Sequence, residues 1–136
     1  MLKQLRLMTQ SGIRISIPLH PYRTVICGES GEGKTLVFNT LQQYLSQGIL
    51  GYPCCLIDND KYRGNINFIG RKDALYVIDN ADILLYTHDD LFNLVHSDEY
   101  QFLLMGHNFT NVRTDIRCFG RLSLHGTNLS YIPLEI

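Results

Sequence analysis

The segment with the clearest chemistry is a glycine-rich octet, Gly28-Glu29-Ser30-Gly31-Glu32-Gly33-Lys34-Thr35, which matches the pattern G-x-x-x-x-G-K-[ST] at every fixed position. Glycines let the backbone curl so that successive N–H groups point at a bound pyrophosphate, and a helix after the loop adds the positive end of its dipole. Lys34 would reach the β- and γ-phosphates as a mobile point charge, and the Thr35 hydroxyl would bind Mg²⁺. The octet therefore predicts a site for a nucleoside triphosphate.

A carboxylate is expected as a further protein group on the Mg²⁺ side, at the end of a hydrophobic strand. Asp58 follows the apolar run 54–57 and lies 24 residues after Lys34. Asp79 follows the apolar run 75–78 and lies 45 residues after Lys34. Both aspartates meet the description, so the residues by themselves leave two candidates for the metal-side carboxylate.

On these residues the sequence resembles the P-loop NTPase superfamily, whose Walker A motif is this octet. In the AAA-like branch one strand–helix unit separates the two motifs, so the resemblance implies that Asp79 is the metal-side carboxylate and Asp58 ends the intervening strand. It also implies a glutamate after that aspartate, as base for the attacking water. The chain has Asn80 there, and an amide orients water but cannot take its proton at neutral pH. Hydrolysis is therefore expected to be slow or absent, with Asp82 as a substitute base.

The resemblance further implies a polar residue at the tip of the fourth strand, between the two motifs, where it contacts the γ-phosphate. Asn108, or His107 beside it, follows the apolar run 102–105 and matches this position. Asn108 is accordingly expected to be a catalytic residue together with Lys34 and Asn80. A polar residue at any strand end near the surface is the ordinary alternative.

Three arginines, Arg113, Arg117 and Arg121, are spaced four residues apart and would share a face on either a helix or a strand. One of them could act as an arginine finger on the γ-phosphate of a neighbouring subunit. A solvated polar edge is the plainer interpretation, because arginine commonly protects exposed strands from pairing.

The elements that must position these residues follow from periodicity and turn signals. A helix is expected over about 33–47, followed by Gly48 at a favoured cap position, and a further helix is expected to start at Thr87. Strands are expected near 23–27, 54–57, 74–78 and 102–105, with terminal hairpins formed by 2–8 with 13–18 and by 116–125 with 129–136. This order predicts a single α/β domain over 1–136, a three-layer α/β/α sandwich with a mostly parallel central sheet and β-hairpins at both termini.

Composition excludes several classes of function. The 136 residues carry 12 Lys and Arg against 13 Asp and Glu, a net charge of −1, so charge does not indicate nucleic acid as a partner. The apolar runs are too short to span a bilayer, and the first residues lack an apolar signal region, so we expect a cytoplasmic protein with no membrane partner. The cysteines lack metal-ligand spacing and are expected to be buried, reduced thiols: Cys27, Cys54, Cys55 and Cys118.

Together these features predict a small Mg²⁺·ATP-binding ATPase that is slow alone and activated by self-assembly or by a protein partner. ATP is favoured over GTP because no Asn-Lys-x-Asp motif is present to read guanine. A non-catalytic nucleotide-dependent switch or adaptor is one alternative. A small-molecule kinase is another, with Asp58 or Asp60 binding the acceptor hydroxyl and with Arg63, Arg71 or the arginines of 113–121 shielding the γ-phosphate.

Overall fold

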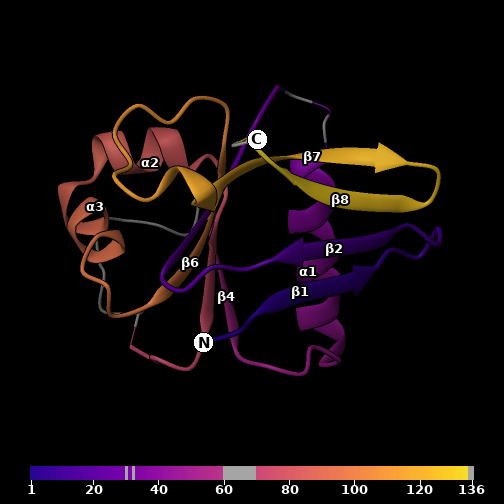
Figure 1. Cartoon of the computed structure of the whole chain (residues 1–136). Helices are drawn as coiled ribbons and strands as arrows, with labels where there is room; N and C mark the ends of the chain where they lie inside the picture. The colour runs from indigo at the N-terminus through magenta and orange to yellow at the C-terminus, as the bar shows by residue number, and fades with distance from the viewer. Residues whose placement is uncertain (30, 32, 60–69, 135–136) are drawn as a thin grey trace.

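Figure 1 shows a computed structural model of the chain, which describes residues 1–29, 31, 33–59 and 70–134. Within these residues the strands form one eight-stranded sheet in the order β1-β2-β8-β7-β3-β6-β5-β4. The strands are β1 (Gln4–Met8), β2 (Arg14–Pro18), β3 (Arg23–Cys27), β4 (Cys54–Ile57), β5 (Leu75–Ile78), β6 (Gln101–Gly106), β7 (Phe119–His125) and β8 (Asn128–Pro133). The helices are α1 (Lys34–Gln47), α2 (Ala81–Thr87), α3 (Asp89–Val95) and the short 3₁₀ helix η2 (Ile116–Cys118).

One half of the sheet is parallel and deeply buried. Strands β3, β6, β5 and β4 pair in parallel, and every residue of β5 and β6 is buried. Parallel strands need cover on both faces, which explains why these strands are continuous apolar runs in the sequence. On one face α2 and α3 supply the cover, with Leu84 and Leu91 packed in the same cluster as Phe102. The parallel half therefore provides the rigid platform on which the ends of β3, β5 and β6 are aligned.

The other half of the sheet consists of two hairpins, β1–β2 and β7–β8, joined by parallel pairing of β2 with β8. Their strands alternate between buried and exposed residues, as expected of strands with one buried face. The buried leucines and isoleucines pack in one cluster with Val37, Phe38 and Leu41 of α1. In Figure 1 these four strands cross in front of α1. The hairpin half thus curls around α1 as a half-barrel.

The predicted three-layer α/β/α sandwich is wrong. The hairpin strands extend the same sheet beyond β3 and enclose α1, so α1 lies inside the curl and does not form an outer helical layer. The helices described are also few and short, with 14 residues in α1 and 7 each in α2 and α3. Strands and helices do alternate along part of the chain, as predicted. This order gives no information about the pairing of β2 with β8, which creates the curl.

Helix boundaries follow local signals with one exception. The predicted helix over about 33–47 is α1, and Gly48 ends it in the left-handed conformation. Thr87, the predicted helix start, is instead the last residue of α2, and His88 precedes α3. In the part of the chain that the structure describes, no helix combines the length and the apolar character needed to cross a membrane.

Candidate functional site

A cavity of about 660 Å³ lies where β7 diverges from β3, next to the glycine-rich loop that follows β3. Four separate segments contribute to its lining. The loop and the start of α1 provide Gly31, Gly33, Lys34 and Thr35; the end of β5 provides Asp79 and Asn80; the end of β6 provides His107; and β7 and β8 complete it with Arg121, Ser123 and three leucines. The cavity therefore lies where the glycine-rich loop adjoins the carboxyl ends of the parallel strands.

The loop owes its shape to glycines at positions that other residues rarely tolerate. Gly31 and Gly33 have φ values of +88° and +111°, in the left-handed region that favours glycine. Gly33 is also closely packed, since a Cβ placed there would lie 2.9 Å from Cδ1 of Leu129 on β8. The backbone N–H of Val37 donates to the Gly33 carbonyl at 3.1 Å and starts the hydrogen bonding of α1. The amino end of α1 is thus directed at the cavity by its contact with the hairpin half.

Lys34 places its positive charge inside the loop. Its Nζ donates to the carbonyl of Gly28 at 2.7 Å and to the carbonyl of Glu29 at 2.8 Å. These two acceptors are neutral carbonyls, so they orient the ammonium group without cancelling its charge. An anion that enters the cavity therefore meets a cation that is already positioned by the loop.

Asp79 brings a carboxylate to the opposite side of the same cavity. The side chain is half-buried, and its Oδ1 accepts the backbone N–H of Asn80 at 3.0 Å. Burial raises the pKa of the Asp79 carboxyl above its usual value, the nearby charges of Asp58 and Asp82 raise it further, and Lys34 opposes the shift. A cation bound next to Asp79 would relieve this cost, so the site has an electrostatic reason to hold one.

Asp82 has a role that the sequence did not reveal. Its Oδ2 accepts the backbone N–H groups of His107 and Asn108 at 3.0 and 3.1 Å, which ties the start of α2 to the end of β6. The contact is close because Gly106 has no side chain, and a Cβ there would lie 2.5 Å from Oδ1 of Asp82. Asp82 is thus held by amides at the end of β6. The sequence offers one hint of this contact: Gly106 ends an apolar strand, and Asp82 is an acidic residue in the first turn of α2.

Most of the predicted binding residues converge. Gly31, Gly33, Lys34 and Thr35 line the cavity, whereas Gly28 and Glu29 contribute the carbonyls that hold Lys34. Ser30 and Glu32 were also predicted to bind phosphate, and they lie outside the described residues.

The predicted metal and catalytic residues converge only in part. Asp79 and Asn80 line the cavity together with Thr35. Asn80 has a φ of +51° and begins α2, so the backbone turns sharply between the two motif residues. Asn108 is not part of the lining, and its neighbour His107 takes that position instead. Asp58 follows β4, the strand paired with β5, and so lies near Asp79, but it is not in the lining. The metal role of Asp79 stays a prediction.

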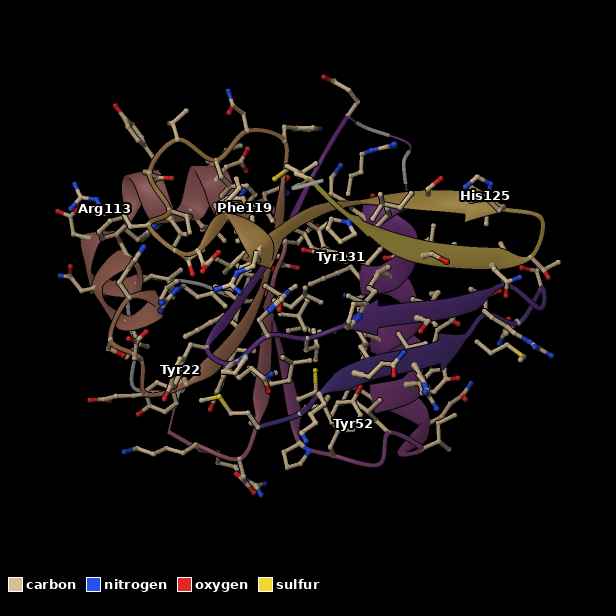
Figure 2. The ribbon with its side chains drawn as sticks, viewed as in Figure 1. Tyr22, Tyr52, Arg113, Phe119, His125 and Tyr131 are labelled. Atoms are coloured by element: carbon tan, nitrogen blue, oxygen red, sulfur yellow. The ribbon has the colours of Figure 1, made fainter. Side chains whose placement is uncertain are left out.

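The three arginines do not form a common face, because they belong to different elements. Arg113 lies in the loop before η2, where its backbone N–H donates to Nε2 of His96 at 3.0 Å. Arg117 in η2 forms a two-pronged contact with the Asp115 carboxylate, at 3.1 Å from Nε and 2.7 Å from Nη2. Arg121 on β7 is the one of the three that reaches the cavity. Figure 2 shows Arg113 beside the helical side of the molecule, well away from the β7–β8 hairpin.

The donor set fits Mg²⁺ only in combination with phosphate. Within residues 1–29, 31, 33–59 and 70–134 no three His, Cys, Asp or Glu side chains are grouped to hold a metal ion. Magnesium commonly keeps several waters and is bound through one or two carboxylates together with substrate phosphates. The Asp79 carboxylate and the Thr35 hydroxyl, both in the lining, match that pattern.

Cys27 ends β3 directly before the loop and is the thiol nearest to the site. Burial raises the pKa of its thiol, and the charge of Lys34 partly opposes this shift. A thiol with a raised pKa stays protonated at neutral pH and is a poor nucleophile. Cys27, Cys54 and Cys55 are half-buried, Cys118 is buried, and none of the four forms a disulfide.

No protein-family model, curated protein or solved structure matches this chain. The family assignment implied by the octet is therefore corrected, since neither sequence comparison nor overall fold places the chain in the P-loop NTPase superfamily. The fold is a curled mixed sheet with few helices, mostly antiparallel at one end. An eight-residue motif constrains the local backbone only, and the same local geometry can be built into sheets of different overall form.

Proposed function

We propose that this chain binds the triphosphate of Mg²⁺·ATP in the cavity between the glycine-rich loop and β7. The observation that supports this proposal is the convergence of Lys34, Asp79 and Arg121, from three distant parts of the sequence, on one cavity of about 660 Å³. Small-ligand sites usually have volumes of about 300–1,000 Å³. Two cationic side chains and one carboxylate in such a space suit a polyphosphate with its divalent cation.

Each residue has a distinct part in the proposed binding. Lys34 would exchange the carbonyls of Gly28 and Glu29 for phosphate oxygens, which are charged and therefore stronger acceptors. Thr35 and Asp79 would hold Mg²⁺, which neutralises the charge on the β- and γ-phosphates when bound. The amino end of α1 would add a favourable partial positive charge.

The proposed activity is slow hydrolysis of ATP, raised by assembly or by a protein partner. Asn80 follows Asp79 and has an amide, so it can orient a water molecule but cannot remove its proton. Asp82 is already engaged by the backbone of His107 and Asn108, which makes it a poor base. A group supplied from outside the chain would be needed for fast turnover.

The test is titration calorimetry with ATP and with GTP in the presence of Mg²⁺, followed by phosphate release on the same samples. Lys34→Ala should abolish nucleotide binding. The matched control is Lys72→Ala, an exposed lysine that does not line the cavity, which should bind as the wild type does. ATP should bind more tightly than GTP, and phosphate release should stay close to background. Equal binding by wild type and Lys34→Ala would refute the proposed site.

A non-catalytic switch is the second candidate, and the Asp82 contact supports it. Asp82 accepts hydrogen bonds from the backbone N–H groups of His107 and Asn108. A ligand that moves Asp79 or Asn80 would therefore also move Asp82 and, through it, the end of β6. Hydrogen exchange with and without ATP should then show changed protection at residues 80–83 and 106–108. A switch predicts this change without phosphate release. An ATPase predicts phosphate release that a partner increases.

A further inference from the structure

The net charge of −1 conceals a strong separation of charge between the two halves of the molecule. The two hairpins with their turns, residues 1–18 and 119–133, contain four Lys and Arg and not one Asp or Glu, a net charge of +4. The remaining residues carry eight Lys and Arg against thirteen Asp and Glu, a net charge of −5. A sheet built from these hairpins is therefore locally cationic although the protein as a whole is slightly acidic.

The cationic residues are concentrated on one face of the hairpin half, here named the outer face: the side of β1, β2, β8 and β7 that turns away from α1. Strand register fixes which residues share it. Arg6 lies opposite Ser16, which lies opposite Ser130, which lies opposite Ser123, and the adjacent row contains Arg14, Asn128 and His125. Gln4 and Arg121 belong to the same face, because alternate residues of a strand point to the same side. Arg121 lies beyond the residues of β7 that pair with β3, so its side chain borders both this face and the cavity at the glycine-rich loop.

Side-chain contacts confirm this placement. Nε2 of Gln4 donates to Oγ of Ser16 at 2.6 Å across the β1–β2 pair, and Nη2 of Arg6 donates to Oε1 of Gln4 at 3.0 Å. At the other side of the face, Oγ of Ser123 and Nε2 of His125 are 2.9 Å apart. Figure 2 shows His125 near the tip of the β7–β8 hairpin. The outer face is therefore mainly polar across four strands, and its non-aromatic apolar members are Met8, Pro18 and Ile132.

In the part of the chain that the structure describes, no ion pair involves an arginine of the outer face, because the ion pairs there are formed by Arg23, Arg71 and Arg117. Arg6 and Arg14 are exposed and line a hollow of about 400 Å³. The rest of its lining is partly polar and partly apolar or aromatic: Ser16, Asn128 and Ser130, with Leu7, Met8, Ile15, Tyr44 and Leu129. The hollow therefore has two arginines and no carboxylate in its lining.

We propose that the outer face binds the phosphate backbone of a nucleic-acid duplex. Arginine, serine, asparagine and glutamine are the side chains that commonly contact phosphate oxygens, and these types dominate the face. A protein partner is disfavoured because stable protein interfaces need several apolar or aromatic anchors, and Met8 is the one strongly exposed large apolar side chain among the described strand residues of this face. A single strand is disfavoured because bases need exposed rings on which to stack, and Phe119, the aromatic residue in line with this face, packs against the core cluster that α2 and α3 cover.

The geometry is compatible with several simultaneous phosphate contacts. Strands in a sheet are about 4.8 Å apart, so the three strand-to-strand steps from Arg6 on β1 to Arg121 on β7 span about 14 Å. Over that length a duplex presents about eight phosphate charges. Binding of this kind is independent of base sequence and has the strong dependence on salt that follows from counterion release.

The test is the anisotropy of a fluorescent 20-base-pair DNA duplex of random sequence, titrated with the full chain at several salt concentrations. Three phosphate contacts predict a slope of log K against log salt of about −2.7, or about 40-fold weaker binding at 200 mM than at 50 mM salt. The double substitution Arg6→Gln and Arg14→Gln should reduce the slope to about −0.9, or about 3-fold over the same range. An RNA duplex of the same sequence should behave similarly.

Two control variants distinguish duplex binding at the outer face from binding elsewhere on the protein. Arg71→Gln with Arg117→Gln removes the same charge from exposed arginines outside the face and should leave the slope unchanged. Lys34→Ala should also leave it unchanged, so failure at the nucleotide site and failure at the outer face are distinguishable. The proposal is overturned by absence of duplex binding by the wild type at 50 mM salt, or by an unchanged slope in the double variant. Tighter binding to a single strand or to a polyglutamate peptide would likewise overturn it.

Discussion

The two halves of the sheet are made of the same kind of element but serve different purposes. In the parallel half, β5 and β6 are buried along their whole length, and polar residues are concentrated at the carboxyl ends of the strands. In the hairpin half each strand has one buried face, and the other face is polar and cationic. The comparison shows that burial on both faces leaves only strand ends for chemistry, whereas burial on one face leaves a whole surface for contact.

The proposed nucleotide site lies at the junction of these halves and draws on both. The parallel half contributes Asp79 and His107, and the hairpin half contributes Arg121 and the leucines against which Gly33 packs. The loop itself is held between them. Charge differs across the cavity in the same sense as between the halves, with the Asp79 carboxylate on the side of the parallel half and the Arg121 guanidinium on the side of the hairpin half.

The largest expected effect is the loss of folding stability when a buried leucine is truncated, and it should be greater in the parallel half than in the hairpin half. Leu104 lies in β6 at the centre of the sheet with no exposed area, and Leu7 lies in the edge strand β1. Leu104→Ala should destabilise by about 4 kcal/mol, because its surroundings cannot collapse into the cavity. Leu7→Ala should cost about 2 kcal/mol, near the low end of the range for such truncations, because an edge hairpin can relax. Urea unfolding of both variants measures the difference, and equal losses would contradict the ranking.

The next effect concerns the joint between the halves, where β7 leaves β3. The ring of Tyr131 lies directly over Gly120, in the place that a Cβ would occupy, and its hydroxyl donates to the Cys118 carbonyl at 3.0 Å. Gly120→Ala should displace this ring and destabilise the protein by about 1–3 kcal/mol. Thermal unfolding measures the loss, with Gly51→Ala as a control, because a Cβ at Gly51 would meet nothing within 4 Å and its backbone is not left-handed. Unchanged stability of Gly120→Ala would show that the joint is loosely packed.

A smaller effect of the opposite sign is expected at Asp79. The pKa of this carboxyl is raised in the folded chain, so its ionised form at neutral pH opposes folding. Asp79→Asn should therefore raise the melting temperature at pH 7 while Mg²⁺·ATP no longer stabilises the variant. The gain should shrink as the pH falls through the raised folded pKa, and it should vanish below the unfolded pKa of about 3.9, where the carboxyl is protonated in both states. A melting temperature below that of the wild type at pH 7, without nucleotide, would contradict a destabilising charge at this position.

The smallest effect concerns Asp115, which lies in the connection from β6 to β7. The Arg117 guanidinium and backbone N–H lower the pKa of the Asp115 carboxyl to about 2. Arg117→Gln should raise this pKa toward the ordinary value, but not fully, because the backbone N–H of residue 117 still donates to Oδ1. NMR titration of the carboxyl carbon measures the change. Because the pair is exposed, stability should change little, and a large loss would show that this connection is held more tightly than its exposure indicates.

Local features of the fold were predictable from particular residues. The glycine-rich octet followed by apolar residues at helical spacing predicts the loop and α1, and Gly48 marks the end of that helix. The alternating residues of β1 and β2 around Gly12 predict the first hairpin, which the structure confirms. By contrast, α2 was missed, because it has only seven residues and most of them are apolar, so no helical alternation of apolar and polar positions can be recognised.

The candidate site was predictable to the extent that its residues lie in local motifs. Lys34, Thr35, Asp79 and Asn80 were named from the sequence and share one cavity in the structure. Their chemical roles stay predictions. Asn108 was chosen over His107, and the structure gives the cavity position to His107, since one residue of difference in where a strand ends decides which side chain faces a site.

The sequence by itself determined the features that depend on neighbours in the chain: the turns that require glycine, the strand and helix periods, and the absence of carboxylates from both terminal hairpins. Only the tertiary structure decided how these pieces combine. It pairs β2 with β8 and β7 with β3, and through these pairs it curls the sheet around α1, brings Arg121 to the loop and sets Arg6 and Arg14 on one face. The physical reason is that pairing between segments roughly a hundred residues apart depends on the fit of whole surfaces, which no local pattern records.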